Sequence, residues 1–593
     1  MFYIISVIPL TKIKTFGNET LDYFSSKKPH IGGLVLINIG KREEKAIVLS
    51  IKTLEDKKVE IKSAQFKLKP IIKIISDCSV VNKQQIELAQ WISEYYLYSL
   101  GACFRLFLPK SVLNRKTEIK NITIHDNSPK EKIKPLLFWS ENRIKEYKKE
   151  IQKILKQKKQ VLFIVPEKHD LETYKDLFNF TIVTSDLRTK DEMNIYNDMP
   201  QLILGTRKSL FLPYNNLGLI ILDQEENDSY KSWDQNPKYQ TRTVALKMAD
   251  IHSSKIILGT DLPDVTTYHY ADKNVLDFKK DLKKEIIPIK IVDLKEEIKK
   301  KNYSIFSKQL SSKLKSVDSA AIFVNRKGMA TSVGCRDCGH IIECNDCKVP
   351  MVYYSDPNHL LCHYCKSIKP VPDTCPNCKG FRIKYFGTGI QKAQNRLKAL
   401  NIIAQPIDSD AQYDGSKFIV GTQSIFNLKE KFDLGVVLLL DPMINRPEYR
   451  TMEKAIQTLN NIKKISKEII IQTYDSKSYI LEHFINNSFE DFFKQDIVLR
   501  KALDYPPFTK IIRLNYKDKD IKRGARLVDK GKQDLEKLFT KTKILGPSPS
   551  FIPRIHGKYS WDIILKTKTK NLTILRSILG PAWEIDVDPQ TLI

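Results

Sequence analysis

Long apolar runs are missing from this sequence of 593 residues, and none approaches the roughly 20 residues that a membrane-spanning helix needs. The first residues, MFYIISVIPLTKIK, lack a basic leader and a small-residue cleavage site, so they predict a strand rather than a signal peptide. We therefore expect no membrane partner and a cytoplasmic location. A chain of this length exceeds what one hydrophobic core supports, which predicts about three to five domains.

Acidic residues are too few to balance the basic ones. The sequence has 98 Lys and Arg against 69 Asp and Glu, a net charge of +29. This excess favours binding to nucleic acid, because neutralising phosphates releases condensed counterions. The alternative is a general lysine bias spread over solvated faces, since the balance does not say where the charge lies.

Cysteine is scarce outside one segment. Only Cys78 and Cys103 lie elsewhere, and the other eight cysteines form four Cys-x-x-Cys knuckles within residues 335–378. One knuckle points two thiolates at an ion, and two knuckles complete a tetrahedron. Four knuckles therefore predict two closed zinc sites, which are structural because no position is left for a water. An iron–sulfur cluster would usually need fewer, differently spaced thiolates.

The four knuckles can pair in three ways. A nested arrangement joins the inner knuckles across a 14-residue insert, close to the usual zinc-ribbon spacing. Joining the first two knuckles would instead require a loop of only five residues. We therefore predict zinc 1 at Cys335, Cys338, Cys375 and Cys378, and zinc 2 at Cys344, Cys347, Cys362 and Cys365.

The remaining sequence divides into strand-rich and alternating regions. Apolar runs such as VLFIVPE (161–167) and LGLIILDQEE (217–226) are typical of parallel strands covered on both faces. Two such α/β units in tandem, the first with an acidic strand end, indicate a helicase-like pair of lobes. The predicted organisation is an N-terminal domain at 1–110, a linker at 111–133, a first lobe at 134–275, a second lobe at 276–334 and 381–490, a zinc insert at 335–380, and an α+β domain at 491–593.

The cysteine segment also carries a family resemblance. VGCRDCGHIIECNDCKVPM, LLCHYCKS and DTCPNCKG resemble the cysteine insert of primosomal protein N′, the PriA family of replication-restart DNA helicases. Companion segments agree in order along nearly the whole chain, among them GTRKSLFLPYNNLGLIILDQEE, GTGIQKAQNRL, DYPPF, ILGPSP and DVDP. The resemblance implies two RecA-like lobes of the superfamily 2 helicase type, a β-rich N-terminal DNA-binding domain and a C-terminal α+β domain. The family's winged helix is missing, because only the linker 111–133 stands in its place.

The resemblance also implies a nucleotide site, and here the sequence departs from the family pattern. The segment LLFWSENRIKEY (136–147) has none of the three expected phosphate-loop glycines, and Arg143 and Ile144 stand where Lys and Thr belong. The acidic motif keeps Asp223, which could still hold a metal, but Gln224 replaces the acid that activates water.

In the second lobe, an ungapped match puts Ile465 and Glu468 where two arginines would reach the γ-phosphate. An arginine of this kind contributes roughly 10³–10⁵ in rate. With the phosphate loop and the acidic motif also altered, we predict that ATP and Mg²⁺ are not working cofactors.

A pocket for the 3′ end of DNA is implied at Leu21, Asp22, Tyr23, Gly40 and Lys41. In such a pocket an acid or backbone group accepts the terminal hydroxyl, an aromatic ring stacks on the last base, and the lysine meets a phosphate. The alternative is an ordinary turn between two strands.

Together these features predict a PriA-like, nucleoid-associated protein that binds forked or 3′-ended DNA in replication restart and primosome assembly. Its expected partners are primosome or replisome proteins, including a single-stranded-DNA-binding protein and a helicase loader. One alternative is an active ATP-dependent 3′→5′ DNA helicase that works with altered residues. Another is a protein-interaction scaffold whose DNA surfaces are vestigial.

Overall fold

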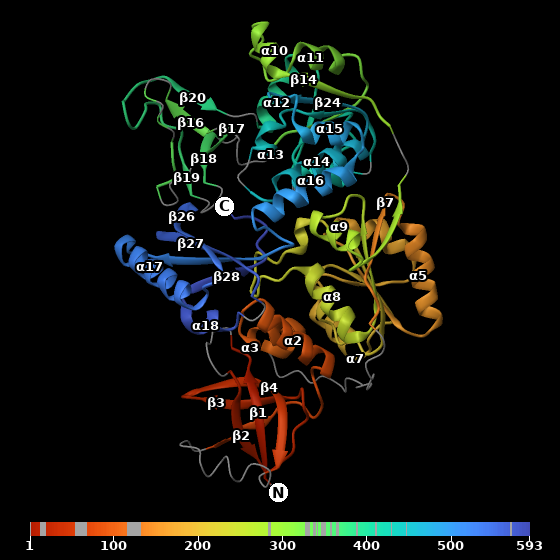
Figure 1. The fold of residues 1–593 in the computed structure, drawn as a ribbon, viewed down its shortest axis with the longest axis vertical. Helices are drawn as coiled ribbons and strands as arrows, with labels where there is room; N and C mark the ends of the chain where they lie inside the picture. Colours follow the sequence, from red (N-terminus) through yellow and green to blue (C-terminus); the bar gives the residue numbers. More distant parts are fainter. Residues whose placement is uncertain are drawn as a thin grey trace.

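The computed structural model describes most of the chain, in five main regions (Figure 1). The described residues are 2–11, 19–53, 68–114, 132–282, 286–325, 332–335, 338, 340, 342–345, 351–355, 358–362, 367–386, 389–408, 412–428, 430–445, 448–569 and 572–592. Figure 1 shows an N-terminal β domain at one end, two α/β lobes above it, a small sheet beside the second lobe, and a C-terminal domain beside the first.

The N-terminal domain is a six-stranded sheet in the order β5-β2-β1-β4-β3-β6. Strands β1 and β3 are buried on both faces, because Ile5 and Val35 belong to one hydrophobic cluster and Ile8 and Leu34 to another. The strands are β1 (Tyr3–Pro9), β2 (Leu21–Ser25), β3 (Leu34–Ile39), β4 (Arg42–Thr53), β5 (Lys69–Pro70) and β6 (Lys73–Ile74).

Three helices follow this sheet and join it to the first lobe: α2 (Lys83–Tyr95), α3 (Leu100–Phe104) and α4 (Lys110–Asn114). Helix α2 begins with a capping box, in which the Asn82 side chain accepts from the Gln85 N–H and the Gln85 side chain accepts from the Asn82 N–H. The remaining amide donors of both side chains reach the first lobe, at the carbonyls of Tyr214 and Phe211, each at 3.0 Å. The cap therefore also fixes the N-terminal domain on its neighbour.

The first lobe contains a seven-stranded parallel sheet in the order β13-β7-β12-β11-β8-β10-β9. Every residue of β11 is buried, which matches a strand covered by helices on both faces. The strands are β7 (Leu136–Ser140), β8 (Gln160–Ile164), β9 (Thr181–Val183), β10 (Leu202–Gly205), β11 (Leu217–Asp223), β12 (Lys255–Thr260) and β13 (Asp277–Asp281). The helices are α5 (Ile144–Lys156), α6 (Leu171–Tyr174), α7 (Thr189–Asn197), α8 (Thr241–His252) and α9 (Val265–Asp272).

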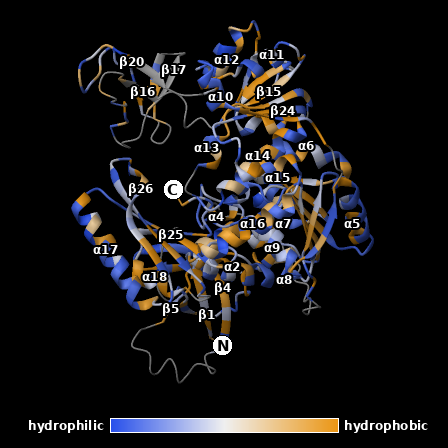
Figure 2. Cartoon of the chain, turned by 45° about the horizontal axis from the view of Figure 1, so that its top comes forward, coloured by the Kyte–Doolittle hydropathy of each residue, from blue (hydrophilic) through white to orange (hydrophobic). Residues whose placement is uncertain are grey.

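The second lobe has a six-stranded parallel sheet in the order β14-β24-β23-β15-β22-β21. Figure 2 shows the hydrophobic colouring of its strands around β15 and β24. The strands are β14 (Ile289–Asp293), β15 (Ala320–Phe323), β21 (Gln405–Ile407), β22 (Phe418–Gly421), β23 (Phe432–Val437) and β24 (Ser466–Thr473). The helices are α10 (Leu294–Lys299), α11 (Lys308–Leu314), α12 (Ile390–Lys398), α13 (Asp441–Ile444), α14 (Thr451–Lys464), α15 (Tyr479–Ile485) and α16 (Phe489–Ala502). The two parallel sheets confirm the predicted pair of helicase-like lobes.

The cysteine segment forms its own antiparallel sheet between β15 and α12 of the second lobe, in the order β19-β18-β17-β16-β20. Its strands are β16 (Ser332–Cys335), β17 (Val352–Ser355), β18 (Asn358–Leu361), β19 (Ile368–Lys369) and β20 (Ile383–Phe386). The segment is thus an insert in the second lobe.

The C-terminal domain is a four-stranded antiparallel sheet in the order β26-β27-β25-β28. It consists of β25 (Lys510–Asp518), α17 (Ile521–Leu538), β26 (Lys543–Ile555), β27 (Lys558–Thr567), α18 (Ile574–Leu579) and β28 (Trp583–Val587). Lys231 of the first lobe is 3% exposed and donates to the Val587 carbonyl at 2.6 Å, which holds this domain against the lobe.

A shared hydrophobic cluster joins the two lobes. The ring centroid of Phe493 in α16 lies 4.6 Å from that of Tyr268 and 5.9 Å from that of Trp139, both in the first lobe. Helix α16 therefore packs with the lobes, although the predicted C-terminal domain begins at residue 491. The cluster contains Trp139, Leu262, Val265 and Tyr268 from the first lobe, and Phe489, Phe492 and Phe493 from α16.

Residues 111–114 of the predicted linker belong to α4, and residues 115–131 lie outside the described part of the chain. Among the residues that are described, no helix combines the length and the apolar character required to cross a membrane.

Candidate metal, nucleotide and DNA sites

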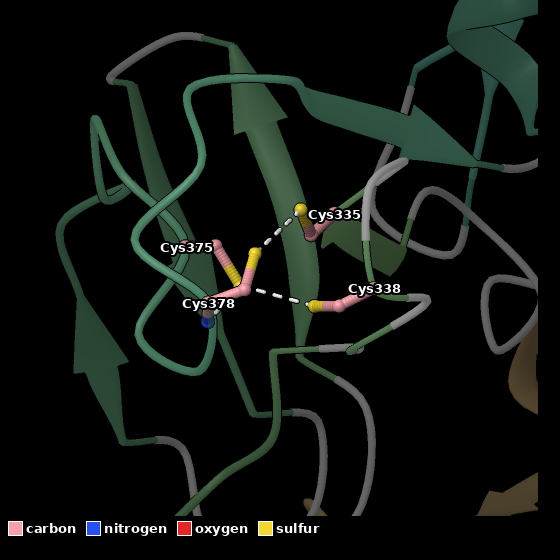
Figure 3. Close-up of side chains that lie close together, drawn as sticks. All are labelled: Cys335, Cys338, Cys375 and Cys378. Carbon is pink, nitrogen blue, oxygen red and sulfur yellow. Dashed lines mark hydrogen bonds between the residues drawn. The ribbon is translucent and has the colours of Figure 1, made fainter.

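Four cysteine sulfurs from the two ends of the cysteine segment lie together (Figure 3). The Sγ atoms of Cys335 and Cys378 are 3.5 Å apart, those of Cys338 and Cys375 are 3.6 Å apart, and all four lie within 4.8 Å of one another. Four thiolates around a tetrahedral zinc at roughly 2.3 Å are about 3.8 Å apart. The cluster therefore fits the ion, and the first and fourth knuckles meet as the nested pairing predicts.

Backbone N–H groups donate to sulfurs of this cluster. The Cys378 N–H donates to the Cys375 sulfur at 3.5 Å, inside a turn closed by the hydrogen bond from the Cys375 N–H to the Gly380 carbonyl. The His340 N–H, followed by the neighbouring Cys378 thiol, lowers the pKa of Cys338 to about 6. A lowered pKa favours the thiolate, which is the form that binds zinc.

Of the inner knuckles, the structure describes one cysteine each. Cys344 and Cys362 are buried in the small core of the insert, beside Val333, Met351 and Leu360. Cys347 and Cys365 lie outside the described residues. The second zinc site stays a prediction.

At the nucleotide position, the structure has a strand where a phosphate loop would lie. Leu136–Ser140 form β7, which pairs with β12 on one side and β13 on the other, so their backbone groups are used within the sheet. Only residues 141–143 connect β7 to α5, which begins at Ile144. A phosphate loop depends on a longer glycine-rich segment whose free N–H groups wrap the phosphates. This connection is too short to do so.

Arg143, at the expected lysine position, is 7% exposed and turned inward. Its Nε donates to Asp223 at 2.7 Å, and its Nη1 donates to the Ser140 carbonyl at 2.6 Å and also pairs with Asp261. Burial lowers the pKa of Arg143, but Asp223 and Asp261 hold it above its usual range. The guanidinium thus fills the space between the ends of β7, β11 and β12.

Two tyrosines complete the shell around Asp223, which is fully buried. The Tyr147 hydroxyl donates to Oδ1 of Asp223 at 2.7 Å, and the Tyr174 hydroxyl donates to Oδ2 at 2.5 Å. Burial and then Asp223 raise the pKa of Tyr147, so that this ring stays a donor. Gly259 makes room for it, since a Cβ there would lie 1.6 Å from the hydroxyl. Both carboxylate oxygens of Asp223 are thereby committed to protein donors.

Gln224 follows with a left-handed backbone (φ 51°) and donates to the Asp170 carboxylate at 3.1 Å. An amide at this position provides no general base. The side chains of Asp223 and Gln224 in the acidic motif therefore both hydrogen-bond to other side chains of the protein.

In the second lobe, neither predicted arginine position carries a cation. Ile465 is 6% exposed within a hydrophobic cluster, and Glu468 in β24 pairs with Lys313 of α11. Lys464 instead reaches across and pairs with Asp261. Counting the Gln-x-x-Gly-Arg-x-Gly-Arg spacing from Gln457 puts Asn461 and Lys464 at the arginine positions, so the spacing could have identified Lys464.

The residues of the proposed 3′-end pocket differ in exposure. Tyr23 is 5% exposed, and its hydroxyl donates to the Asn38 carbonyl at 2.6 Å, so its ring lies in the core of the domain. Asp22 on the same strand accepts from the Ser6 hydroxyl at 2.6 Å. Gly40 and Lys41 form the exposed turn between β3 and β4, and a left-handed φ of 62° suits Gly40 to that turn. The Tyr23 hydrogen bond brings β2 next to this turn.

Comparison with known proteins gives three family matches. Residues 8–109 match the 3′ DNA-binding domain of PriA, residues 344–370 the Cys-rich region domain of PriA DNA helicase, and residues 501–590 the primosomal protein N C-terminal domain. "Replication restart protein PriA" of Bacillus subtilis is 30% identical across 73% of this chain and 59% of that protein. The protein of the same name in Borreliella burgdorferi is 28% identical across 86% of each chain. This chain belongs to the PriA family.

The match to the Bacillus subtilis PriA spans less than two thirds of that protein's length. Among solved structures, the chain resembles Saccharomyces cerevisiae Dbp5 bound to RNA and ADP BeF3, with 12% identity and a TM-score of 0.34 over 62% of this chain and 89% of that one. It also resembles the Mycobacterium smegmatis helicase Lhr bound to single-stranded DNA and AMP-PNP, with 8% identity and a TM-score of 0.29 over 55% of this chain and 42% of that one.

Several residues of this PriA-family chain were missed by sequence reasoning. Tyr174 carries no motif of its own, and only the fold brings it to Asp223. Lys464 has a motif signal in its spacing from Gln457, but its pairing with Asp261 is visible only in the fold. Trp233 is 72% exposed, on a loop held by the hydrogen bond from the Ser232 N–H to the Tyr239 carbonyl. An exposed tryptophan on a braced loop is suited to stacking on a base.

Proposed function

We propose that this PriA-family protein binds forked or 3′-ended DNA and recruits primosome proteins without hydrolysing ATP. Its partners would include a single-stranded-DNA-binding protein and a helicase loader, and it would act in the cytoplasm, at the nucleoid. Two zinc ions would stabilise the insert, with Cys344, Cys347, Cys362 and Cys365 holding the second.

The observation that carries this proposal is the inward-turned Arg143. Its guanidinium pairs with Asp223 and Asp261 at the place where a helicase of this type holds phosphate and Mg²⁺. Nucleotide binding there would require breaking a buried ion pair, which is strongly unfavourable because it leaves charges without partners. The short connection at residues 141–143 provides no alternative cradle.

DNA binding is supported by exposed groups on two separate regions. Lys41 is exposed on the β3–β4 turn, beside the strand that carries Asp22, and Trp233 is exposed on the first lobe. Lysine would neutralise a phosphate and tryptophan would stack on a base. Because Tyr23 is buried, we assign it to fixing the β3–β4 turn rather than to stacking.

The first experiment measures phosphate release and binding of a fluorescent ATP analogue, with forked DNA present. We expect neither to exceed the level of an Asp223→Ala protein, which controls for a contaminating ATPase. Release that depends on DNA and is lost in the Asp223→Ala protein would establish the active helicase instead. The binding measurement decides independently if that variant folds poorly.

The second experiment compares forks whose leading strand ends in a 3′-hydroxyl or a 3′-phosphate. We expect tighter binding of the hydroxyl end, and we expect Lys41→Ala to weaken both. The matched control is Lys300→Ala, which removes the same charge just after α10, at the far end of the molecule from the N-terminal domain (Figure 1). Weak binding with a shallow salt dependence and no structure preference would favour the scaffold alternative.

A further inference from the structure

The carboxylate of Asp261 lies between the two lobes and pairs with one cation from each. Its Oδ1 accepts from Arg143 of the first lobe, and its Oδ2 accepts from Lys464 of the second. The Asp261 side chain is 16% exposed, and the backbone carbonyl of the same residue accepts from the Trp139 indole at 2.8 Å. Both sides of the carboxylate are therefore occupied, and its position is fixed.

These two cations come from the positions that meet a nucleotide in a working pair of lobes. Arg143 stands at the phosphate-loop lysine, and Lys464 stands at an arginine position when the motif is counted from Gln457. In nucleoside triphosphatases, such groups close on the terminal phosphate from opposite sides. Here a side-chain carboxylate takes the place of that anion.

A second set of ion pairs crosses the same interface. Arg450 of the second lobe pairs with Asp228 at 3.2 Å and with Asp264 at 3.3 Å, and Lys454 pairs with Asp228 at 2.6 Å. The Arg450 side chain is only 10% exposed. Burial lowers the pKa of Arg450, but Glu453, Asp228 and Asp264 hold it above its usual range, so it stays charged.

Apolar packing supports the ion pairs from one side. Trp139, 1% exposed, belongs to β7 and contacts Phe493 of α16, while Lys280 lies 4.8 Å over its ring. A residue from the strand that replaces the phosphate loop thus forms part of the joint between the lobes. The joint between the lobes thus consists of a buried aromatic cluster and the ion pairs of Asp261 and Arg450. Both sets of contacts are made entirely by protein groups.

We propose that Asp261 is a built-in substitute for the terminal phosphate of a nucleotide, and that it holds the two lobes together at all times. The proposal rests on the proposed function only in that no nucleotide competes for Arg143. Because the anion is part of the chain, its local concentration never falls, and the lobes have no cycle of opening and closing. The protein would then present one fixed DNA-binding surface whether or not ATP is present.

Amide hydrogen exchange of the full-length zinc-loaded protein tests this joint. The change is made in the second lobe, as Lys464→Glu, and exchange is read in the first lobe, at α9. The matched control is Lys463→Glu, the same change on the preceding residue, whose Nζ contacts Asn487 of its own lobe at 2.5 Å. Helix α17 of the C-terminal domain is the internal reference.

We expect α9 of the unaltered protein to exchange equally with and without Mg-ATP. In Lys464→Glu it should exchange about 10-fold faster or more, because like charges meet at Asp261 and local opening becomes easier. Lys463→Glu and Lys464→Arg should match the unaltered protein. Lys464→Ala removes the cation without adding repulsion and should give a smaller increase in the same direction.

Unchanged exchange of α9 in both Lys464→Glu and Lys464→Ala would overturn the proposal. Slower exchange of α9 on adding Mg-ATP to the unaltered protein would also overturn it, since a nucleotide would then be closing the lobes. The phosphate-release experiment stays separate. If the protein does not hydrolyse ATP but the exchange of α9 is unchanged in the Lys464 variants, only the proposed role of Asp261 is contradicted.

Discussion

The zinc insert differs from the nucleotide position, which is called the cleft below and comprises Arg143, Tyr147, Tyr174 and Asp223 with their neighbours, in what its donor groups contact. In the insert, four sulfurs from distant knuckles lie within 4.8 Å of one another, with a geometry that a metal ion would complete. In the cleft, Arg143 and two tyrosines already complete the shell of Asp223. One region keeps its donors directed at a ligand, and the other directs them at protein groups.

The two regions differ in the source of the cation that stabilises them. Four thiolates close together repel when ionised, so the insert needs a cation to gain its full stability. In the cleft, Arg143 already supplies the cation, and a bound ligand could only break its ion pairs with Asp223 and Asp261. We therefore expect the insert to depend on zinc and the cleft to be indifferent to nucleotide.

The largest effect should come from Cys375→Ser, which removes a fully buried member of the outer cluster. Structural zinc contributes roughly 10–16 kcal/mol to folding in zinc-finger peptides, so the insert should lose its zinc 1 and unfold locally. Because the insert has its own core, apart from those of the lobes, the lobes should keep their exchange protection. Zinc content and amide exchange of β16 and β20 measure the change.

The control for this experiment is Cys78→Ala, a buried cysteine outside the insert. It should keep the full zinc content. A Cys375→Ser protein with unchanged zinc would contradict the assignment of the outer knuckles to one ion.

The next effect should come from Asp223→Ala, which strips the buried Arg143 and both tyrosines of their main acceptor. Leaving a buried charge without its partner costs about 3–5 kcal/mol. The comparator is Asp433→Ala, whose pair with the 64%-exposed Lys467 should contribute only about 0–1 kcal/mol. Thermal unfolding, followed by amide exchange in the lobe that carries each change, distinguishes the two variants. Equal losses would mean that the buried ion pair of Asp223 contributes no more to stability than an exposed one.

Much of this contrast could be predicted from sequence, because periodicity and spacing are local signals. Cys-x-x-Cys knuckles and buried apolar runs predicted the insert and both parallel sheets. The replacement of glycines between residues 136 and 143 predicted an altered phosphate site. What replaced that site could not be predicted. The spacing from Gln457 marks Lys464, but the contacts of Tyr174 with Asp223 and of Lys464 with Asp261 depend on tertiary packing between distant elements.

In the proposed DNA pocket, the direction of the Tyr23 ring could not be predicted from the sequence either. Sequence could select Tyr23 as an aromatic beside an acid, but strand alternation decides which way its ring points. Tyr23 pairs with Ile5 of β1 and faces the core, whereas the Gly40–Lys41 turn faces outward. A two-residue period fixes the side of a sheet only when the register of its neighbours is known.

A smaller effect is expected from pH, through Glu226 in the cleft. Burial, followed by the charges of Glu225 and Asp261, raises the pKa of Glu226 to about 8, and Lys464 opposes this shift. The unfolded chain then releases this proton near pH 4.5 while the folded chain keeps it, so stability falls as pH rises from about 4.5 to about 8. The slope is at most about 1.4 kcal/mol per pH unit.

Melting temperatures across this pH range measure the slope, with Glu226→Gln as the test. The neutral amide cannot ionise, so its stability should be flatter from pH 5 to about 8 than that of the unaltered protein. A slope of the same size in Glu226→Gln would assign the dependence to another group.

The smallest effect is expected from restoring motif residues. The double change Arg143→Lys and Ile144→Thr brings back the two side chains that meet phosphate and Mg²⁺. It should still give no measurable ATP binding, because β7 keeps the preceding backbone within the sheet and only residues 141–143 remain to form a loop. Binding of a fluorescent ATP analogue is the measurement, and saturable binding would show that side chains alone closed the cleft. No binding would mean that the backbone, and not only the side chains, prevents nucleotide binding. The zinc insert differs in this respect, because the backbone turns of its outer knuckles still bring the cysteine sulfurs together.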